Sequence, residues 1–292
     1  MPLTTLGDGR TLQWSEGGDP DGHPVVFCHG TPDTRRASWS GHDAAARAGV
    51  RLVAANRPGY GASTPAPPSY QRPADDLVAL ADSLDIERFA LLGMSVGGTF
   101  ALATAARHPD RVRAVATVGC PGPVTSMDPP YPRDDLDDEG RAFFDDLAAG
   151  TTDVNVERVR PGFADFRSLI DPDDPDDDAL AQRWVESLPT EDRVLVESAP
   201  PSERAAAARE AIGVPDGYLA DAALVFAPWP FDLADVRCPV TLWYGERDRQ
   251  APPRHGTWLA GHLPSAELRI LAGLGHLESL VRSWPEVLAR LA

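Results

Sequence analysis

The segment that most restricts the fold of this chain runs from residue 89 to residue 106. An apolar run, Phe89 to Leu92, predicts a buried strand, and the small residues from Thr99 to Ala106 predict a helix. Between them lies the sequence Gly93-Met94-Ser95-Val96-Gly97-Gly98. A serine between two glycines at a strand-to-helix junction is the pattern of a nucleophile elbow. We expect a turn so tight that side chains at positions 93 and 97 would collide with the backbone, with Ser95 strained.

Around this segment, short apolar runs alternate with stretches of helical spacing. The predicted strands are residues 11–14, 25–28, 50–54, 89–92, 112–118, 240–244 and 267–271. Each of the predicted helices follows one of these strands, and they are residues 35–48, 73–84, 99–107, 254–261 and 277–291. Such alternation predicts an α/β fold with a mostly parallel central sheet and helices on both faces. Ligands bind beyond the carboxyl ends of the strands in sheets of this kind.

The stretch 126–216 interrupts this alternation and carries most of the negative charge. It holds 24 Asp and Glu against nine Arg, whereas the whole chain has a net charge of −17. Four of its segments have helical spacing, namely 141–147, 179–188, 191–197 and 202–211. We interpret it as an acidic helical cap inserted into a core made of residues 1–125 and 217–292. A disordered acidic linker is the alternative, but it leaves unexplained the aromatic side chains Phe143, Phe144, Phe163, Phe166 and Trp184.

Composition excludes several classes of function. All 27 basic residues are Arg, and no basic stripe offsets the acids, so we expect no binding to nucleic acid and no lysine nucleophile. No apolar run approaches 18 residues, so we expect no membrane span, and residues 1–8 have no secretory pattern. The cysteines (Cys28, Cys120 and Cys238) are odd in number and far apart, which favours a reduced cytoplasm and no metal site.

Two further polar residues follow predicted strands near the end of the chain. Asp248 comes after strand 240–244, and His276 comes after strand 267–271. We expect both in loops at the sheet edge that also holds Ser95. A histidine can take the proton of a serine nucleophile, and a carboxylate can hold the imidazole in the required tautomer. Four other acids remain as alternatives to Asp248, namely Asp128, Asp221, Asp232 and Asp235.

Together these motifs resemble the α/β-hydrolase fold family, in its capped serine-hydrolase, esterase/lipase-like branch. The resemblance covers residues 10–122 and 217–292 and rests on His29-Gly30, residues 57–63, residues 93–98, residues 245–248 and Gly275-His276. It implies Ser95 as nucleophile, His276 as base and Asp248 as the acid of a triad. It also implies an oxyanion hole made of the backbone N–H groups of Thr31 and Val96, since Pro32 has no N–H.

Some positions bear on the substrate pocket. We expect His29 to fix the oxyanion loop and to border the pocket together with Trp39, Met94, Trp229 and Phe231, with core packing as the alternative for the last four. Asn56 stands where many family members have Asp. Serine rather than aspartate at position 95 disfavours epoxide-hydrolase chemistry. The turn at residues 29–33 differs from that of proline iminopeptidases, so we expect only a distant relationship to these peptidases.

The sequence therefore predicts a hydrolase that needs no cofactor or metal and cleaves a small carboxylic ester, thioester or lactone through an acyl-enzyme. A C–C bond hydrolase of the β-diketone type would use the same triad. A non-catalytic ligand-binding member of the fold is an alternative of another class. A net charge of −15 over the predicted cap favours neutral or cationic small organic substrates, unless the acids only face bulk water.

Overall fold

The structure is a computed structural model, and it describes residues 2–197 and 199–292. Its central element is a single β-sheet. In these residues eight strands pair in the order β1-β2-β4-β3-β5-β6-β7-β8. Their bounds are β1 Leu3–Thr5, β2 Thr11–Gly18, β3 His23–Cys28, β4 Val50–Ala55, β5 Phe89–Met94, β6 Val112–Val118, β7 Val240–Gly245 and β8 Ala266–Leu271. The pairs from β4 through β8 are parallel, and β1 and β2 are antiparallel. The predicted α/β sheet is confirmed.

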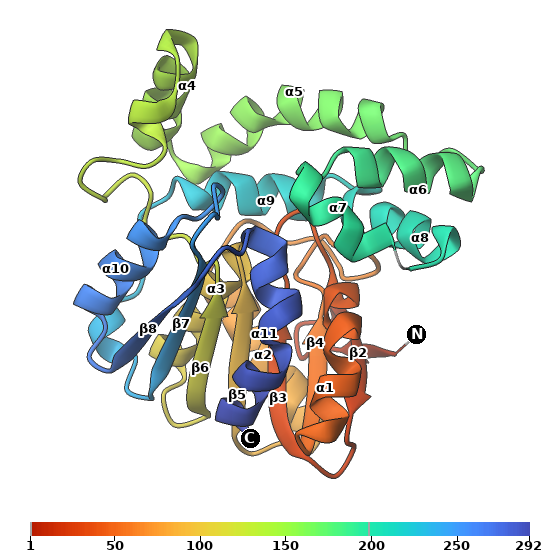
Figure 1. The fold of residues 1–292 in the computed structure, drawn as a ribbon, viewed down its shortest axis with the longest axis vertical. Coiled ribbons are helices and arrows are strands. Elements are labelled where there is room, and N and C mark those ends of the chain that lie inside the picture. Colours follow the sequence, from red (N-terminus) through yellow and green to blue (C-terminus); the bar gives the residue numbers. More distant parts are fainter. Residues whose placement is uncertain (1, 198) are drawn as a thin grey trace.

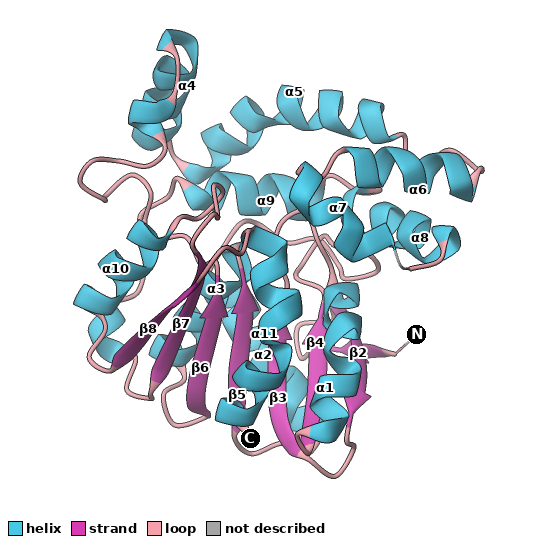
Figure 2. Ribbon diagram, in the orientation of Figure 1, coloured by secondary structure: helices cyan, strands magenta, loops and turns pink. Residues whose placement is uncertain are grey.

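The central strands are apolar along their whole length because both of their faces are covered. Every residue of β5 is buried, and Leu91 pairs with Val26 on one side and with Val115 on the other. Since the paired strands run in the same direction, their carboxyl ends lie along one edge of the sheet. The loops that follow β3, β5, β6 and β7 therefore meet there, as Figure 2 shows.

Two layers of helices bury the two faces of the sheet. Leu280, Trp284 and Leu288 of α11 pack on one face with Ala44 and Ala45 of α1. The opposite face is covered by α2, α3 and α10. The bounds of these helices are α1 His42–Arg47, α2 Gln71–Ser83, α3 Val96–Arg107, α10 Pro253–His262 and α11 His276–Leu291. Figure 1 shows α1 and α11 together in front of the strands.

A helical segment, residues 138–225, lies between β6 and β7 and extends over the carboxyl ends of the strands (Figure 1). Its helices are α4 Asp138–Ala149, α5 Thr152–Ile170, α6 Asp177–Glu186, α7 Thr190–Glu197, α8 Pro201–Ile212 and α9 Asp216–Val225. Phe163, Leu180, Trp184 and Leu219 form part of a core of its own. The predicted helices in this stretch are present, but α5 and α9 were not predicted, and the helices continue past residue 216.

Three local expectations differ from the structure. The predicted helix 35–48 is divided into a 3-10 helix, Arg35–Gly41, and the short α1. Strand β1 was not predicted. His276 is not in a loop but is the first residue of α11, which starts directly after Gly275. Two further 3-10 turns, Arg133–Asp135 and Leu233–Asp235, flank the helical segment. None of the helices in the described residues is both long and apolar enough to cross a membrane.

Candidate active site

Ser95 lies in the turn between β5 and α3 and has a strained backbone. Its φ of 52° and ψ of −130° lie outside the regions that L-residues favour, which costs about 1–3 kcal/mol. A β-carbon added at Gly93 would lie 2.5 Å from the carbonyl oxygen of Gly97, and one added at Gly97 would overlap the carbonyl of Cys28. Both glycines are therefore required by the close approach of backbone, as the sequence predicts.

Asp248 and His276 form a buried hydrogen-bonded pair. His276 Nδ1 lies 2.6 Å from Asp248 Oδ2, and the two residues are 8% and 3% exposed. Asp248 Oδ1 accepts hydrogen bonds from the backbone N–H groups of Gln250 and Ala251, at 2.8 and 2.9 Å. With both carboxylate oxygens held in this way, Asp248 can keep the imidazole in one orientation and one tautomer.

The end of β6 brings these residues next to Ser95. The N–H of Ser95 donates to the carbonyl of Val118 at 2.8 Å, and Gly119 follows Val118. A β-carbon added at Gly119 would lie 2.8 Å from His276 Cε1 and 3.1 Å from Asp248 Oδ2. The three predicted catalytic residues are thus arranged around one point of the sheet edge. In residues 2–197 and 199–292 the Ser95 hydroxyl has no hydrogen-bond partner.

Two backbone N–H groups near Ser95 have no hydrogen-bond acceptor in the described part of the chain. The N–H of Val96 is at the start of α3, and within the described chain neither it nor the N–H of Thr31 is paired with an acceptor. Gly30 precedes Thr31 and lies against the elbow, since a β-carbon there would be 3.5 Å from Ser95 Cβ. Both amides are therefore available to an oxygen atom bound close to Ser95.

His29 braces the turn after β3. The N–H of Arg57 donates to its Nε2 at 3.2 Å, so Nδ1 carries the proton and donates to the Gly30 carbonyl at 2.8 Å. The residue is fully buried. Burial, followed by the charge of Arg57, holds the pKa of His29 well below its usual value, so the ring is neutral.

The other predicted pocket residues are dispersed. Trp39 is 37% exposed, with the Arg36 guanidinium 4.7 Å above its ring, so it lies on the surface. Met94 packs in the core layer beneath α11. Trp229 and Phe231 stack at 5.1 Å and pack on the cluster that contains Val96, which keeps them close to the elbow.

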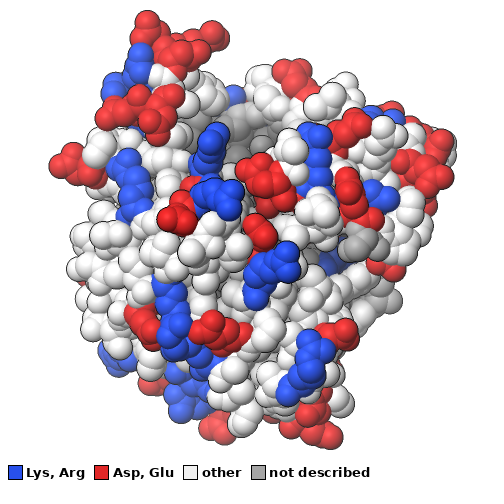
Figure 3. All heavy atoms as spheres, viewed as in Figure 1, with Lys and Arg blue, Asp and Glu red and all other residues white. Residues whose placement is uncertain are grey.

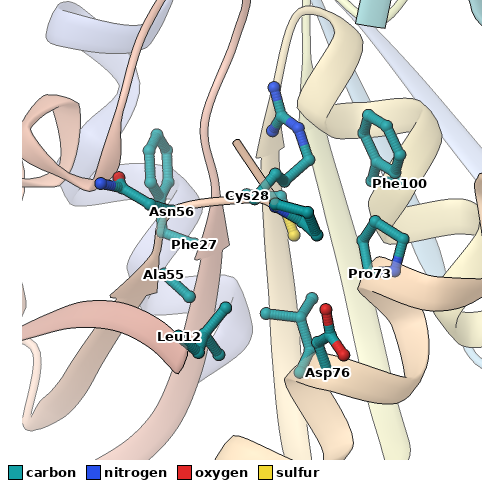
Figure 4. Close-up of a pocket in the computed structure, with 11 residues that line it drawn as sticks. Leu12, Phe27, Cys28, Ala55, Asn56, Pro73, Asp76 and Phe100 are labelled. Carbon is teal, nitrogen blue, oxygen red and sulfur yellow. The ribbon is translucent and has the colours of Figure 1, made fainter. Parts of the chain in front are cut away.

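A small cavity lies beside this site rather than in it. It is lined by residues of β2, β3, α2 and α3 and of the loop after β4, and Leu12, Cys28, Asp76 and Phe100 are among the side chains that border it in Figure 4. Ser95, Asp248 and His276 are not among its lining residues. The described part of the chain contains no group of three or more His, Cys, Asp or Glu side chains that could hold a metal ion.

The fold gives three polar residues at this edge a place that the sequence did not reveal: Asp221, named only as an alternative to Asp248, Arg57, named only as part of a motif, and Asp192, which was not named. Asp221 of α9 binds Arg57 of the loop after β4, at 2.6 Å. Asp192 of α7 is 2% exposed, and a β-carbon at Gly275 would lie 3.9 Å from its Oδ1, which places it beside the start of α11. Burial raises the pKa of Asp192, and the nearby His276 opposes that shift. Both acids come from the helical segment, which contains so many Asp and Glu residues that the sequence does not distinguish the two that are buried at this edge.

Comparison with known proteins identifies the family of this chain. The family model for the alpha/beta hydrolase fold matches residues 23–282. The chain belongs to the alpha/beta hydrolase fold family. Among the curated relatives of this chain, a 2-hydroxymuconate semialdehyde hydrolase of Pseudomonas sp. (strain CF600) is 33% identical over 184 residues, which are 57% of this chain and 63% of the relative. An epoxide hydrolase of Caballeronia sordidicola is 38% identical over 118 residues, or 39% and 35% of the two chains.

Solved structures support the same fold. A bromoperoxidase from Bacillus anthracis superposes with a TM-score of 0.69 at 22% identity and covers 99% of both chains. Identity at this level shows the fold alone. This chain spans less than two thirds of the length of these two curated relatives.

Proposed function

We propose that this protein is a serine hydrolase that cleaves a small carboxylic ester, thioester or lactone through an acyl-enzyme. The observation that carries the proposal is the buried Asp248–His276 pair, which converges with the strained Ser95 at the end of β6. A nucleophile, a base and an acid to orient the base are the three groups that acyl transfer requires.

In the proposed reaction, Ser95 Oγ attacks the substrate carbonyl carbon while His276 Nε2 takes the hydroxyl proton. Asp248 stabilises the imidazolium that forms, through the bond to Nδ1. The negative oxygen of the tetrahedral intermediate accepts from the free amides of Thr31 and Val96, and losing one such donor typically costs about 3 kcal/mol of transition-state stabilisation. His276 then protonates the leaving alcohol, and water, activated by the same base, releases the acid.

The helical segment acts as the cap of this site in the proposal. Its own core, and its position over the carboxyl ends of the strands, support a cover that shapes the acyl pocket. We also propose a cytoplasmic location, which is supported by three cysteines that are buried as free thiols.

The test is intact-mass spectrometry after treatment with a fluorophosphonate. We expect one adduct on the wild type and on Ser265→Ala, which changes an exposed serine, and none on Ser95→Ala. An adduct of equal yield on Ser95→Ala would refute the assignment of the nucleophile. Capture of small ligands without turnover, unaffected by Ser95→Ala, would favour a binding protein instead.

A second candidate is hydrolysis of a C–C bond beside a carbonyl, with the same three residues. The similarity to the 2-hydroxymuconate semialdehyde hydrolase, at 33% identity, favours it. Turnover of a small aryl ester and of a vinylogous β-diketone would be compared on one preparation. A kcat/KM at least tenfold higher on the diketone would make the second candidate the better description.

Charge supports a preference for neutral or cationic substrates. Acidic side chains gather over α4 and at the outer end of α6 in Figure 3. Because such exposed charges are screened by salt, a preference that they cause must weaken at high ionic strength. We expect the ratio of kcat/KM for matched neutral and anionic esters to fall between low and high salt. A ratio that stays constant would mean that the acids serve only solubility.

A further inference from the structure

Asp221 joins the helical segment to the turn that carries Thr31. Its Oδ2 accepts hydrogen bonds from Thr31 Oγ1 at 2.6 Å, Arg57 Nη2 at 2.6 Å and Tyr60 Oη at 2.7 Å. Asp221 belongs to α9, whereas its three partners belong to the loops after β3 and β4. The carboxylate is 3% exposed, so water does not compete strongly for these bonds.

Asp221 also balances a buried charge. The Arg57 guanidinium is 7% exposed and donates to the carbonyl oxygens of His29 and Gly30 as well. Burial alone would lower the pKa of Arg57, but the charge of Asp221 and its hydrogen bond, together with Tyr60 and Cys28, outweigh burial and the pKa is raised. An arginine that loses this partner would keep its charge in a buried place and would be drawn away from the two carbonyls.

The Gly30 carbonyl controls the direction of the Thr31 amide. The carbonyl of residue 30 and the N–H of residue 31 belong to one planar peptide group and point in opposite directions. Arg57 Nη2 and His29 Nδ1 both donate to the Gly30 oxygen, each at 2.8 Å. Holding that oxygen on the Arg57 side therefore turns the Thr31 N–H to the other side of the peptide.

The helix that supplies Asp221 is seated directly on the loop after β4. A β-carbon at Gly59, whose φ is +83°, would lie 2.5 Å from the N atom of Gly217, in the first turn of α9. Gly217 in turn lies against the ring of Tyr60. This close approach sets the depth at which α9 docks, and hence the position of Asp221.

We propose that Asp221 is a positioning residue that, through Arg57 and Thr31, keeps the Thr31 amide directed at the oxyanion. This inference rests on the proposed function. It implies that the oxyanion hole is complete only when α9 is docked on the loop after β4. The residue does not touch the substrate. Its removal is expected to lower the rate of the chemical step more than it changes substrate binding.

The experiment compares Asp221→Asn with a matched control, Glu210→Gln. Glu210 also joins the helical segment to the core, since Arg36 Nε and Asn56 Nδ2 donate to it at 2.7 and 2.9 Å, but it does not contact the Gly30–Thr31 peptide. The rate constant for fluorophosphonate labelling and the kcat and KM on a small aryl ester are measured per folded molecule. We expect Asp221→Asn to reduce the labelling rate and kcat about 30-fold with KM within threefold, and Glu210→Gln to remain within twofold of the wild type.

A second pair of variants covers the case in which Asp221→Asn does not fold. Thr31→Val removes the hydroxyl that donates to Asp221 but keeps the backbone N–H, so we expect a loss of about tenfold in labelling rate. Thr31→Ser restores a hydroxyl and should recover most of that loss. Equal labelling of Thr31→Val and wild type, or an equal loss in Asp221→Asn and Glu210→Gln, would overturn the inference. An unlabelled wild type would instead refute the proposed function itself.

Discussion

Substitution of Gly119 by alanine is the most direct perturbation of the candidate triad. The new β-carbon would lie 2.8 Å from His276 Cε1 and 2.9 Å from Nδ1, where ordinary contacts begin at 3.4 Å. The imidazole would have to move by roughly 0.6 Å, against its 2.6 Å hydrogen bond to Asp248. Because a misplacement of 1 Å can cost about 100-fold in rate, we expect kcat/KM to fall about 30-fold.

The control for this variant is Gly49→Ala. Gly49 has a φ of +64°, close to the +58° of Gly119, but a β-carbon there would have no atom within 4 Å. Both variants should lose about 1–2 kcal/mol of unfolding free energy through backbone strain, as measured by urea denaturation. Only Gly119→Ala should lose activity in an aryl-ester assay. If the two variants, both folded, had the same kcat/KM, the assignment of His276 as the base would be refuted.

Two further predictions concern stability. Burial lowers the pKa of His255 to about 4, so the folded protein resists protonation of this ring while the unfolded chain accepts the proton. Between pH 6.5 and pH 4 we therefore expect the unfolding free energy of the wild type to fall by roughly 3 kcal/mol more than that of His255→Asn. Equal losses in urea denaturation would contradict this. Glu210→Gln should cost about 3 kcal/mol, since it unpairs buried charge, whereas Glu286→Gln, which breaks an exposed pair with Arg269, should stay within about 0.5 kcal/mol. Thermal and urea unfolding of both variants would show the difference, and similar losses would mean that the Glu210 contacts contribute little.

The elbow and the strands around it follow from neighbouring residues, and this is why the sequence was sufficient to predict them. The apolar run from Phe89 and the glycines around Ser95 restrict the local backbone to a buried strand and a sharp turn. Strand β6 has the predicted bounds of 112 and 118. The order of Ser95, Asp248 and His276 after separate strands also predicts a common sheet edge, because parallel strands end together.

Helices α5 and α9 could not be predicted in the same way. α5 continues through Pro161 and Gly162, which disfavour a helix, because Phe163 and Ile170 are buried in the core of the helical segment. α9 carries buried residues such as Leu219, Asp221 and Leu224 and lacks a polar face that would reveal its period. In both helices tertiary burial outweighs the local preference.

The sequence by itself determined the fold class, the elbow and the candidate triad, because each depends on short motifs and on their order along the chain. Only the tertiary structure decided which of the many acids meets which arginine. Asp221 and Arg57 are 164 residues apart, and nothing next to either of them marks the pairing. A buried charge is stabilised by whichever opposite charge is desolvated with it, and that choice is made when α9 docks on the loop after β4.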